Sequence, residues 1–444
     1  MRQYTATALL LLPSLAFGQG AAPSKPAEQK PAEAPAAKSP APAAAPGAEH
    51  AAAGGEKAAP IVPGTDDWRT AEKDTLTGYV QLTKPDMFVR AGEAYFSGNL
   101  KWIIFQAVPV PEEGKQPDAN YSMYIAKLKF DDQTNITGIE TPILVSPPGS
   151  ANTCGFFNPV KPWEIIFGST FTAPAESAPA GYQRGTSSYR WAFPKEMDVA
   201  TCVVPELLVG RPTPGNKPPR VDPELSRPHP LLTSPGYTAE CSFDPTGRYV
   251  VMAAQDVNAD SPGSRPQIDI DVYDTQAKIM THMITAAGYN GGPFFSADGK
   301  WICYRSDRKG NDMLQLYIAE VQYNNDETLI MGAKREIQLT DDENVNWGPF
   351  WCPSGEYLVY ATSAVGHDNY EVFTIQTPIG ANEGKKPGEL KKKRVTYAAG
   401  FDGLPVFSRY AEWMMWTSQR GGKAPGQEKA SSQIWVARPV NIAP

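Results

Sequence analysis

Short polar side chains recur at fixed distances before an aromatic residue in this sequence. The set comprises Glu93, Asn152, Glu240, Asn290, Asn346 and Asp402. Their carboxylate and amide oxygens could bind a hard cation, or the hydroxyl and amine groups of a ligand. The alternative is that short polar side chains cap the starts of strands and bind water. The first interpretation predicts a binding site at one end of a central channel, and the second predicts a structural role.

The sequence shows no group of residues that is typical of catalysis. Its four histidines, His50, His229, His282 and His367, do not lie at the spacing of metal ligands. A nucleophile elbow of the form Gly-x-Ser-x-Gly is absent, as are a P-loop and the glycine fingerprint of dinucleotide-binding proteins. We therefore expect no catalytic residue, no metal ligand and no cofactor.

Cysteines could form disulfides if the protein is exported. The five are Cys154, Cys202, Cys241, Cys303 and Cys352. The main interpretation is that they are free, buried thiols that pack as small hydrophobic side chains. The alternative is one disulfide between Cys154 and Cys202, provided that the two residues lie within bridging distance. An odd count leaves at least one thiol unpaired in a monomer.

A repeated element must position these residues. Six segments share a pattern that centres on one aromatic residue, namely Phe96, Phe157, Phe243, Phe295, Trp351 and Phe407. The last three aromatic residues are 56 residues apart. Internal similarity at such a period indicates a repeat architecture.

One copy shows what each unit contains. After Phe295 comes the turn Asp298-Gly299, in which glycine supplies the positive φ of a hairpin turn. The next strand, 300–304, is rich in β-branched and aromatic residues, and two more strands are expected at 315–319 and 336–340. Four short antiparallel strands per unit are typical of a propeller blade, so the sequence predicts an all-β, six-bladed β-propeller over residues 66–444. The blades are expected to begin near residues 91, 152, 238, 290, 346 and 402, with an insertion at about 173–230.

The segment 295–311 reads aromatic-Ser-x-Asp-Gly-Lys-Trp-Ile-x-Tyr-x-Ser-Asp-Arg-x-Gly-Asn and resembles the repeat of TolB-like six-bladed β-propellers. The pairs Leu339-Thr340 and Val395-Thr396 match that repeat, as does Gln81-Leu82-Thr83, which should supply the outer strand before the first blade. The resemblance covers about residues 76–440. In place of the Asp-Gly turn, the second copy has Pro-Val-Lys-Pro at 159–162 and the sixth has Arg-Tyr-Ala at 409–411.

The N-terminal residues predict export. Arg2 precedes an apolar run at 6–12 and a small-x-small site at 16–18, which together indicate a signal peptide over residues 1–18. Positions 21–60 contain 17 alanines and 8 prolines, so residues 19–65 are expected to form a disordered linker. No later run is long enough to span a bilayer. We expect a periplasmic or secreted protein.

Composition excludes several classes of protein. The 38 glycines follow no three-residue period and no heptad run occurs, which excludes a collagen and a coiled coil. The formal charge is −7 and the acidity is spread along the chain, so we expect no nucleic-acid partner. The favoured function is a monomeric, non-enzymatic scaffold that engages a protein or peptide in the cell envelope, and the resemblance relates it to Tol-type biopolymer transport. The alternative is a lyase or hydrolase that acts on polysaccharide or peptide at the axial channel.

Overall fold

The computed structural model describes residues 63–444 apart from 176–180, 184–187, 191–193, 209–221 and 260–265. The expected signal peptide and nearly all of the expected linker lie outside the described residues. Within the described part of the chain, no helix combines the length and the apolar character needed to cross a bilayer.

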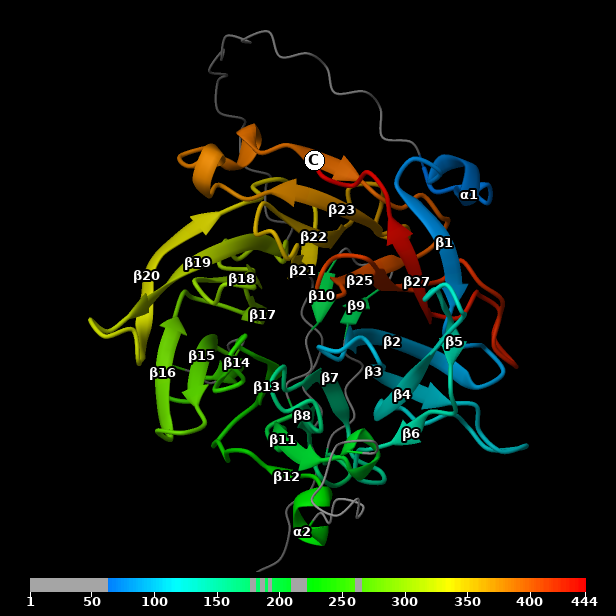
Figure 1. Cartoon of the computed structure of the whole chain (residues 1–444), viewed down its shortest axis with the longest axis horizontal. Coiled ribbons are helices and arrows are strands. Elements are labelled where there is room, and N and C mark those ends of the chain that lie inside the picture. The colour runs from blue at the N-terminus through cyan, green and yellow to red at the C-terminus, as the bar shows by residue number, and fades with distance from the viewer. Residues whose placement is uncertain (1–62, 176–180, 184–187, 191–193, 209–221, 260–265) are drawn as a thin grey trace, which may run out of the picture. The chain divides into compact units, whose positions relative to one another are not determined.

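Six antiparallel sheets are arranged as blades around a central axis (Figure 1). Blade one contains β2 (Phe88–Phe96), β3 (Trp102–Pro109), β4 (Ser122–Phe130) and a divided outer strand, β5 (Ile136–Ile139) and β6 (Ile143–Leu144). Blade two contains β7 (Asn152–Phe157), β8 (Glu164–Ser169), β11 (Asp198–Val203) and β12 (His229–Pro230). Blade three contains β13 (Thr238–Phe243), β14 (Tyr249–Gln255), β15 (Ile268–Asp274) and β16 (Ile279–Ile284).

The remaining three blades complete the ring. Blade four contains β17 (Asn290–Phe295), β18 (Trp301–Ser306), β19 (Gln315–Tyr323) and β20 (Ile330–Gln338). Blade five contains β21 (Asn346–Trp351), β22 (Tyr357–Thr362), β23 (Glu371–Gln376) and β24 (Lys392–Arg394). Blade six contains β25 (Asp402–Phe407), β26 (Met414–Ser418), β27 (Gln433–Pro439) and β1 (Leu76–Gln81). The predicted fold class is confirmed, and the inner strands begin at residues 88, 152, 238, 290, 346 and 402.

Elements outside the blades are short. They are the helices α1 (Trp68–Ala71) and α2 (Pro223–Ser226), the 3-10 helices η1 (Pro205–Leu208), η3 (Gly380–Asn382) and η4 (Pro387–Glu389), and a hairpin of β9 (Gly181–Gln183) and β10 (Ser188–Arg190). The expected insertion at 173–230 contains β11 and β12, which are the third and fourth strands of blade two. Only part of that range is therefore additional to the blade.

The N-terminal strand closes the ring. Strand β1 pairs antiparallel with β27, so blade six takes its outer strand from the beginning of the described chain and its other three from the end. Leu82 and Thr83 follow β1 directly. The Thr83 hydroxyl accepts the backbone N–H of Ile434 at 2.8 Å. The two ends of the propeller are thus held together by the sheet ladder and by one hydroxyl.

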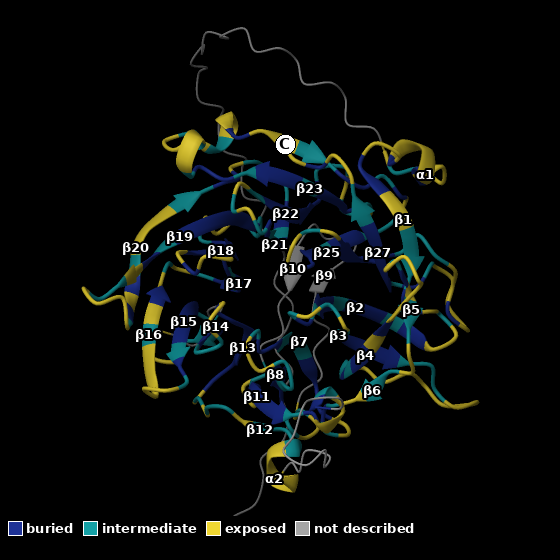
Figure 2. Cartoon of the chain, viewed as in Figure 1, coloured by how far each residue is buried: buried dark blue, intermediate teal, exposed yellow. Residues whose placement is uncertain are grey.

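The Leu-Thr and Val-Thr pairs of the repeat have the same role in other blades. The hydroxyl of Thr340 accepts the N–H of Leu316 at 2.9 Å, and the hydroxyl of Thr396 accepts the N–H of Val372 at 2.8 Å. In each case the outer strand has ended and threonine satisfies a backbone donor of the third strand, which would be costly to bury unpaired. Figure 2 shows the resulting distribution, with buried residues in the middle strands and exposed residues along outer strands such as β16 and β20.

Candidate functional site

Each inner strand carries a bulge at the same repeat position. The residue three places before the blade aromatic is Glu93, Cys154, Glu240, Gly292, Gly348 or Leu404, and its φ lies between 45° and 58°. The register of all six inner strands shifts there. A bulge bends a strand and redirects a side chain. All six residues line a small cavity of about 10 Å³, which is roughly the room of one water molecule.

Glu240 is held by four donors in this cavity. Its Oε1 accepts hydrogen bonds from the hydroxyls of Tyr237 at 3.1 Å and Tyr289 at 2.9 Å. Its Oε2 accepts from the N–H of Gly292 and from Nη2 of Arg305, both at 2.7 Å. A buried carboxylate is tolerated when it is paired and hydrogen-bonded in this way.

Glu93 has a different environment. Its Oε1 accepts a hydrogen bond from the thiol of Cys154 at 2.8 Å and from the hydroxyl of Tyr95 at 3.3 Å. The side chain keeps some exposed surface, but that surface faces the inside of the channel. Burial raises the pKa of Glu93, and the more distant Arg305 only partly opposes the rise. Burial also raises the pKa of the Cys154 thiol, which keeps it a donor.

Four aromatic rings close the channel beside this polar cavity. They belong to Tyr95, Phe156, Phe294 and Phe350, each one place before a blade aromatic. The ring centroids of Phe294 and Phe350 lie 5.0 Å apart, and those of Tyr95 lie 5.4 Å from Phe156 and 5.5 Å from Phe294. Such spacings are those of packed aromatic pairs. We call these four residues the aromatic plug.

A wider cavity of about 500 Å³ opens beyond the aromatic plug, at the end where the hairpin turns of the blades meet. We call it the aromatic funnel, because its wall contains all six blade aromatics, Phe96, Phe157, Phe243, Phe295, Trp351 and Phe407. Three serines also line it, but the hydroxyls of Ser97, Ser296 and Ser408 already accept N–H groups from their own hairpins at 2.9–3.0 Å. The wall is therefore mainly apolar.

Two large apolar side chains stand out at this end of the channel. Val160 is 60% exposed and Tyr410 is 71% exposed. Both occur in the copies that depart from the Asp-Gly turn, next to Pro159 and Arg409 of the funnel wall. The guanidinium of Arg409 lies 5.6 Å from the ring centre of Tyr410. The departures from the repeat thus place apolar surface beside the aromatic funnel.

The structure brings together two of the six predicted site residues, Glu93 and Glu240. The other four are Asn152, Asn290, Asn346 and Asp402, and none of them lines either cavity.

The amide groups of the three asparagines hold the connections between blades, whereas the Asp402 carboxylate accepts hydrogen bonds from Arg420 and Trp416. Nδ2 of Asn290 donates to the carbonyls of Ile268 at 2.9 Å and Ala286 at 2.6 Å, while its Oδ1 accepts from Ser306 at 2.8 Å. Nδ2 of Asn152 donates to backbone carbonyls at 3.0 Å, and Nδ2 of Asn346 donates to a carboxylate at 2.8 Å. At these positions the structure matches the capping interpretation.

The alternative of a disulfide between Cys154 and Cys202 has no suitable geometry. Strand β8 separates β7, which carries Cys154, from β11, which carries Cys202. Two strand spacings amount to about 9.5 Å, whereas a bridge needs Cα atoms within about 7 Å. All five cysteines are free and buried. In the described part of the chain, no group of three or more His, Cys, Asp or Glu residues is placed to hold a metal ion.

Comparisons with known proteins bear on the fold. No family model matches the chain. An uncharacterized protein of Agrobacterium fabrum is 31% identical over 101 residues, which are 22% of this chain and 30% of that protein. The aligned region thus spans less than a third of the relative.

Three solved structures are similar to the chain over most of its length. The putative TolB of Agrobacterium tumefaciens gives a TM-score of 0.42 at 13% identity, over 79% of this chain and 91% of that one. TolB of Acinetobacter baumannii gives a TM-score of 0.43 at 14% identity, over 72% of this chain and 59% of that one. An oligogalacturonate lyase of Vibrio parahaemolyticus gives a TM-score of 0.41 at 10% identity, over 81% of this chain and 93% of that one.

The six four-stranded sheets around one axis decide the fold. This chain is a six-bladed β-propeller. At these identities and TM-scores, the likeness assigns neither an activity nor a partner to the propeller.

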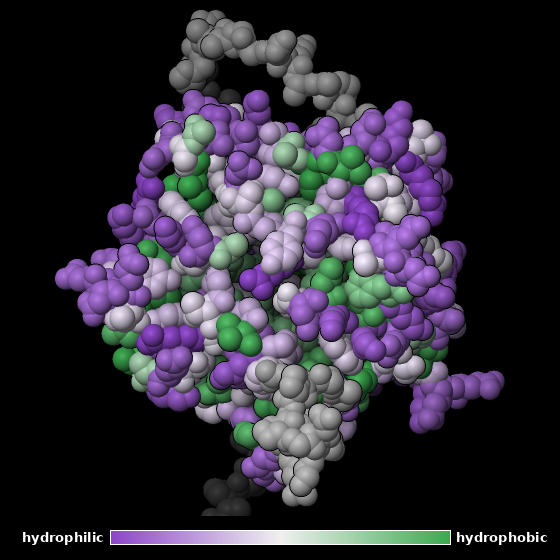
Figure 3. Space-filling model, in the orientation of Figure 1, coloured by the Kyte–Doolittle hydropathy of each residue, from purple (hydrophilic) through white to green (hydrophobic). Residues whose placement is uncertain are grey.

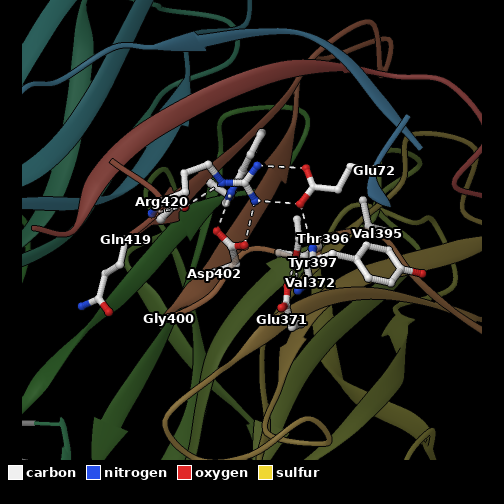
Figure 4. Close-up of polar contacts among 12 residues, drawn as sticks. Glu72, Glu371, Val372, Val395, Thr396, Tyr397, Gly400, Asp402, Gln419 and Arg420 are labelled. Carbon is white, nitrogen blue, oxygen red and sulfur yellow. Dashed lines mark hydrogen bonds and ion pairs between the residues drawn. The ribbon is translucent and has the colours of Figure 1, made fainter. Parts of the chain in front are cut away.

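One polar network of the propeller was missed by the sequence interpretation. Arg420 lies between Glu72 and Asp402, with Nη1 2.9 Å from one carboxylate and Nη2 2.7 Å from the other (Figure 4). The guanidinium also lies 4.3 Å from the ring centre of Trp68 and 4.9 Å from that of Trp416. We call Glu72, Arg420 and Asp402 the closure triad.

The repeat contains a signal for this network. Ser418-Gln419-Arg420 aligns with Ser306-Asp307-Arg308 of blade four, and in both copies the arginine Nε donates to the serine hydroxyl, at 2.9 and 3.0 Å. The repeat therefore marks Arg420 as a structural position. Its partner Glu72 lies 348 residues away in the chain, so no local pattern could identify it.

Proposed function

We propose that this protein is an exported, non-enzymatic binding module that receives an apolar segment of a partner protein or peptide in the aromatic funnel. The observation that carries the proposal is the funnel itself, a cavity of about 500 Å³ with all six blade aromatics in its wall. Binding pockets are typically concave, mostly apolar and of this size. The exposed side chains of Val160 and Tyr410 extend the apolar surface outward.

The aromatic plug limits how a partner can enter. Because Tyr95, Phe156, Phe294 and Phe350 pack across the channel, a bound segment must enter and leave at the funnel end. This geometry suits a chain terminus or a protruding turn, and it does not suit a peptide threaded along the axis.

The chemistry of the wall limits what the segment presents. The three serine hydroxyls accept hydrogen bonds within their own hairpins, and Pro159, Pro245 and Pro353 contribute no backbone N–H. Of the charged residues in the wall, Asp244 already accepts the N–H groups of Arg248 and Tyr249, and Arg409 is exposed. A charged group deep in the cavity would therefore lose water without gaining a partner, which is costly. We therefore expect an apolar or aromatic side chain at the tip of the segment.

The test compares full-length protein with two double variants as bait in envelope extract. The rim variant is V160D/Y410D. The matched control is I279D/M331D, because Ile279 and Met331 are 52% and 58% exposed on the outer strands β16 and β20. A partner recovered with wild type and control, but lost with the rim variant, supports the proposal.

Affinity for the recovered partner gives the quantitative result. We expect the rim variant to bind at least tenfold more weakly, which is about 1.4 kcal/mol. Trp351 lies in the funnel wall, so wild-type tryptophan fluorescence should change on binding. Equal affinity of the rim variant and wild type would place the partner on another surface and reject the proposal.

A further inference from the structure

A basic segment lies at the outer edge of blade five. Residues 383–394 contain six basic and two acidic residues, in a chain whose net charge is −7. The segment includes η4 and ends with β24, the edge strand of its sheet. It belongs to the excursion that Figure 2 draws as largely exposed, beside β23.

Four of the six basic groups are available for a partner. Lys392 pairs with Asp342 at 2.9 Å, and Arg394 pairs with Glu371 at 2.8 Å. No carboxylate within the described residues forms an ion pair with the other four, which are Lys385, Lys386, Lys391 and Lys393. We call these four residues the lysine edge.

The two acidic residues of the segment are already engaged. A carboxylate oxygen of Glu389 accepts the backbone N–H of Lys386 at 2.8 Å, and Glu383 lies 3.3 Å from the guanidinium of Arg335 on blade four. Glu383 is thus paired with a cation outside the segment, while Glu389 keeps its negative charge, so six basic groups still outnumber the two carboxylates. Lysines on an edge strand also oppose its pairing with a strand of another chain. An exposed edge of this kind therefore favours electrostatic contact with a partner over the addition of a partner strand to the sheet.

The described chain begins next to this surface. The N–H of Thr65 donates to the carbonyl of Tyr397 at 2.8 Å, and Thr65 forms a parallel bridge with Ala398, four residues after the end of β24. The first described residues therefore contact the chain just after the strand that ends the basic segment.

We propose that the lysine edge binds an anionic lipid surface. Neither the polar cavity nor the aromatic funnel contains any residue of the segment, so the lysines form an open surface rather than a pocket for a small ligand. Lysine ammonium groups are hydrated point charges on flexible stems, which suits a field of mobile headgroups better than one fixed anion. Clustered lysines are attracted to anionic leaflets within a Debye length.

The experiment measures co-sedimentation of the full chain with vesicles. Phosphatidylcholine vesicles with and without phosphatidylglycerol are compared for wild type and for K385Q/K386Q/K391Q/K393Q. The control variant is K84Q/K101Q/K129Q/K300Q, which removes the same charge from four exposed lysines elsewhere. Neutral vesicles report any contribution of the apolar N-terminal run, which all variants share.

We expect wild type and control to bind the phosphatidylglycerol vesicles alike, and the lysine-edge variant to bind at least tenfold more weakly. The difference should vanish at about 1 M salt, where the Debye length falls to about 3 Å. Equal binding of the lysine-edge variant and wild type would overturn the proposal. So would binding of wild type to the soluble polyanion heparin without binding to the vesicles, because the partner would then be a polymer.

Discussion

Glu93 and Glu240 occupy the same bulge position in two blades but have different surroundings. Glu240 receives hydrogen bonds from four donor groups, including Arg305, whereas Glu93 receives one from a thiol and a longer one from Tyr95. The bulge directs both side chains to the axis, but the groups that surround them differ. This difference makes Glu93 the more informative position for substitution.

The substitution E93Q should change how stability depends on pH. The raised pKa of Glu93 means that the unfolded chain loses this proton first as the pH rises. The stabilising contribution is therefore complete below the unfolded pKa of about 4.3 and is lost as the pH rises through the folded pKa. We expect E93Q and wild type to have similar Tm values at about pH 4, and E93Q to have the higher Tm at about pH 7.

Calorimetry of the exposed-site variant E112Q provides the comparison, because Glu112 and its partner Lys115 are both largely exposed. The Tm difference between E112Q and wild type should stay constant over this pH range. If the Tm difference between E93Q and wild type is equally constant, burial does not raise the pKa of the Glu93 carboxyl.

The two bulge glycines should respond differently to alanine. Gly292 and Gly348 have φ values of 57° and 58°, a conformation that costs other residues about 1–2 kcal/mol. At Gly292 the added Cβ would also overlap Nη1 of Arg305, whereas at Gly348 the nearest atom is Cδ2 of Leu404 at 3.3 Å. We expect G348A to lower the free energy of unfolding by about 1–2 kcal/mol in urea titrations, and G292A to lower it by more. Equal losses would indicate that Arg305 moves aside freely.

At the scale of elements, outer strands determine whether blades stay connected. Threonine hydroxyls after β1, β20 and β24 satisfy donors of the neighbouring third strand. Between blades five and six, the closure triad adds a buried charge network that reaches from the residues before β1 to β25. The Glu72 carboxylate also accepts the N–H of Tyr397 at 2.7 Å. These contacts attach the N-terminal segment to its neighbours.

Removing the central charge of the closure triad should therefore be costly. In R420M, Glu72 and Asp402 would be buried without their cation, and breaking a buried pair in this way typically costs about 3–5 kcal/mol. Urea denaturation of R420M should show a loss of this size.

The compensating variant E72Q/D402N/R420M tests whether the stability loss in R420M comes from carboxylates that are buried without a cation. It removes both carboxylates together with the arginine, so it should recover most of the stability lost in R420M, because no uncompensated charge remains buried. A triple variant as unstable as R420M would mean that the arginine acts through packing against Trp68 and Trp416 instead.

At the scale of the whole molecule, closure of the ring and division of the channel are separate features. Strand β1 joins the N-terminal segment to blade six, and the aromatic plug divides the axis into a polar cavity and an aromatic funnel. Figure 3 shows the outer part of one face covered mainly by hydrophilic residues. The proposed binding surfaces, the aromatic funnel and the lysine edge, lie on different parts of the ring and can be tested independently.

Truncation of the N-terminal segment should show how much strand β1, which completes blade six, contributes to the stability of the propeller. A chain that begins at Thr83 lacks β1 and the buried side chains of Trp68 and Leu76, each worth about 1.5–3 kcal/mol when buried. We expect a much lower Tm and binding of a hydrophobic dye to the opened edge of β27. The control begins at Pro63 and keeps every described contact, so its Tm should match that of the full chain. A normal Tm for the shorter chain would show that five complete blades and a three-stranded sixth suffice.

The sequence by itself determined the fold class, with its six blades of four short antiparallel strands. These features are local, since a strand, a turn glycine and a threonine after an outer strand are each encoded within a few residues. The same reasoning found Glu93 and Glu240, because both lie at a fixed distance from a blade aromatic.

Only the tertiary structure decided what those positions contact. Asn290 and Asp402 share a repeat position, yet the asparagine binds backbone carbonyls while the aspartate binds Arg420 and Trp416. The aromatic plug, the funnel and the pairing of Glu72 with Arg420 depend on side chains from blades that are distant in sequence. Six blades converge on one axis, and the chemistry of that axis arises from residues that local patterns cannot bring together.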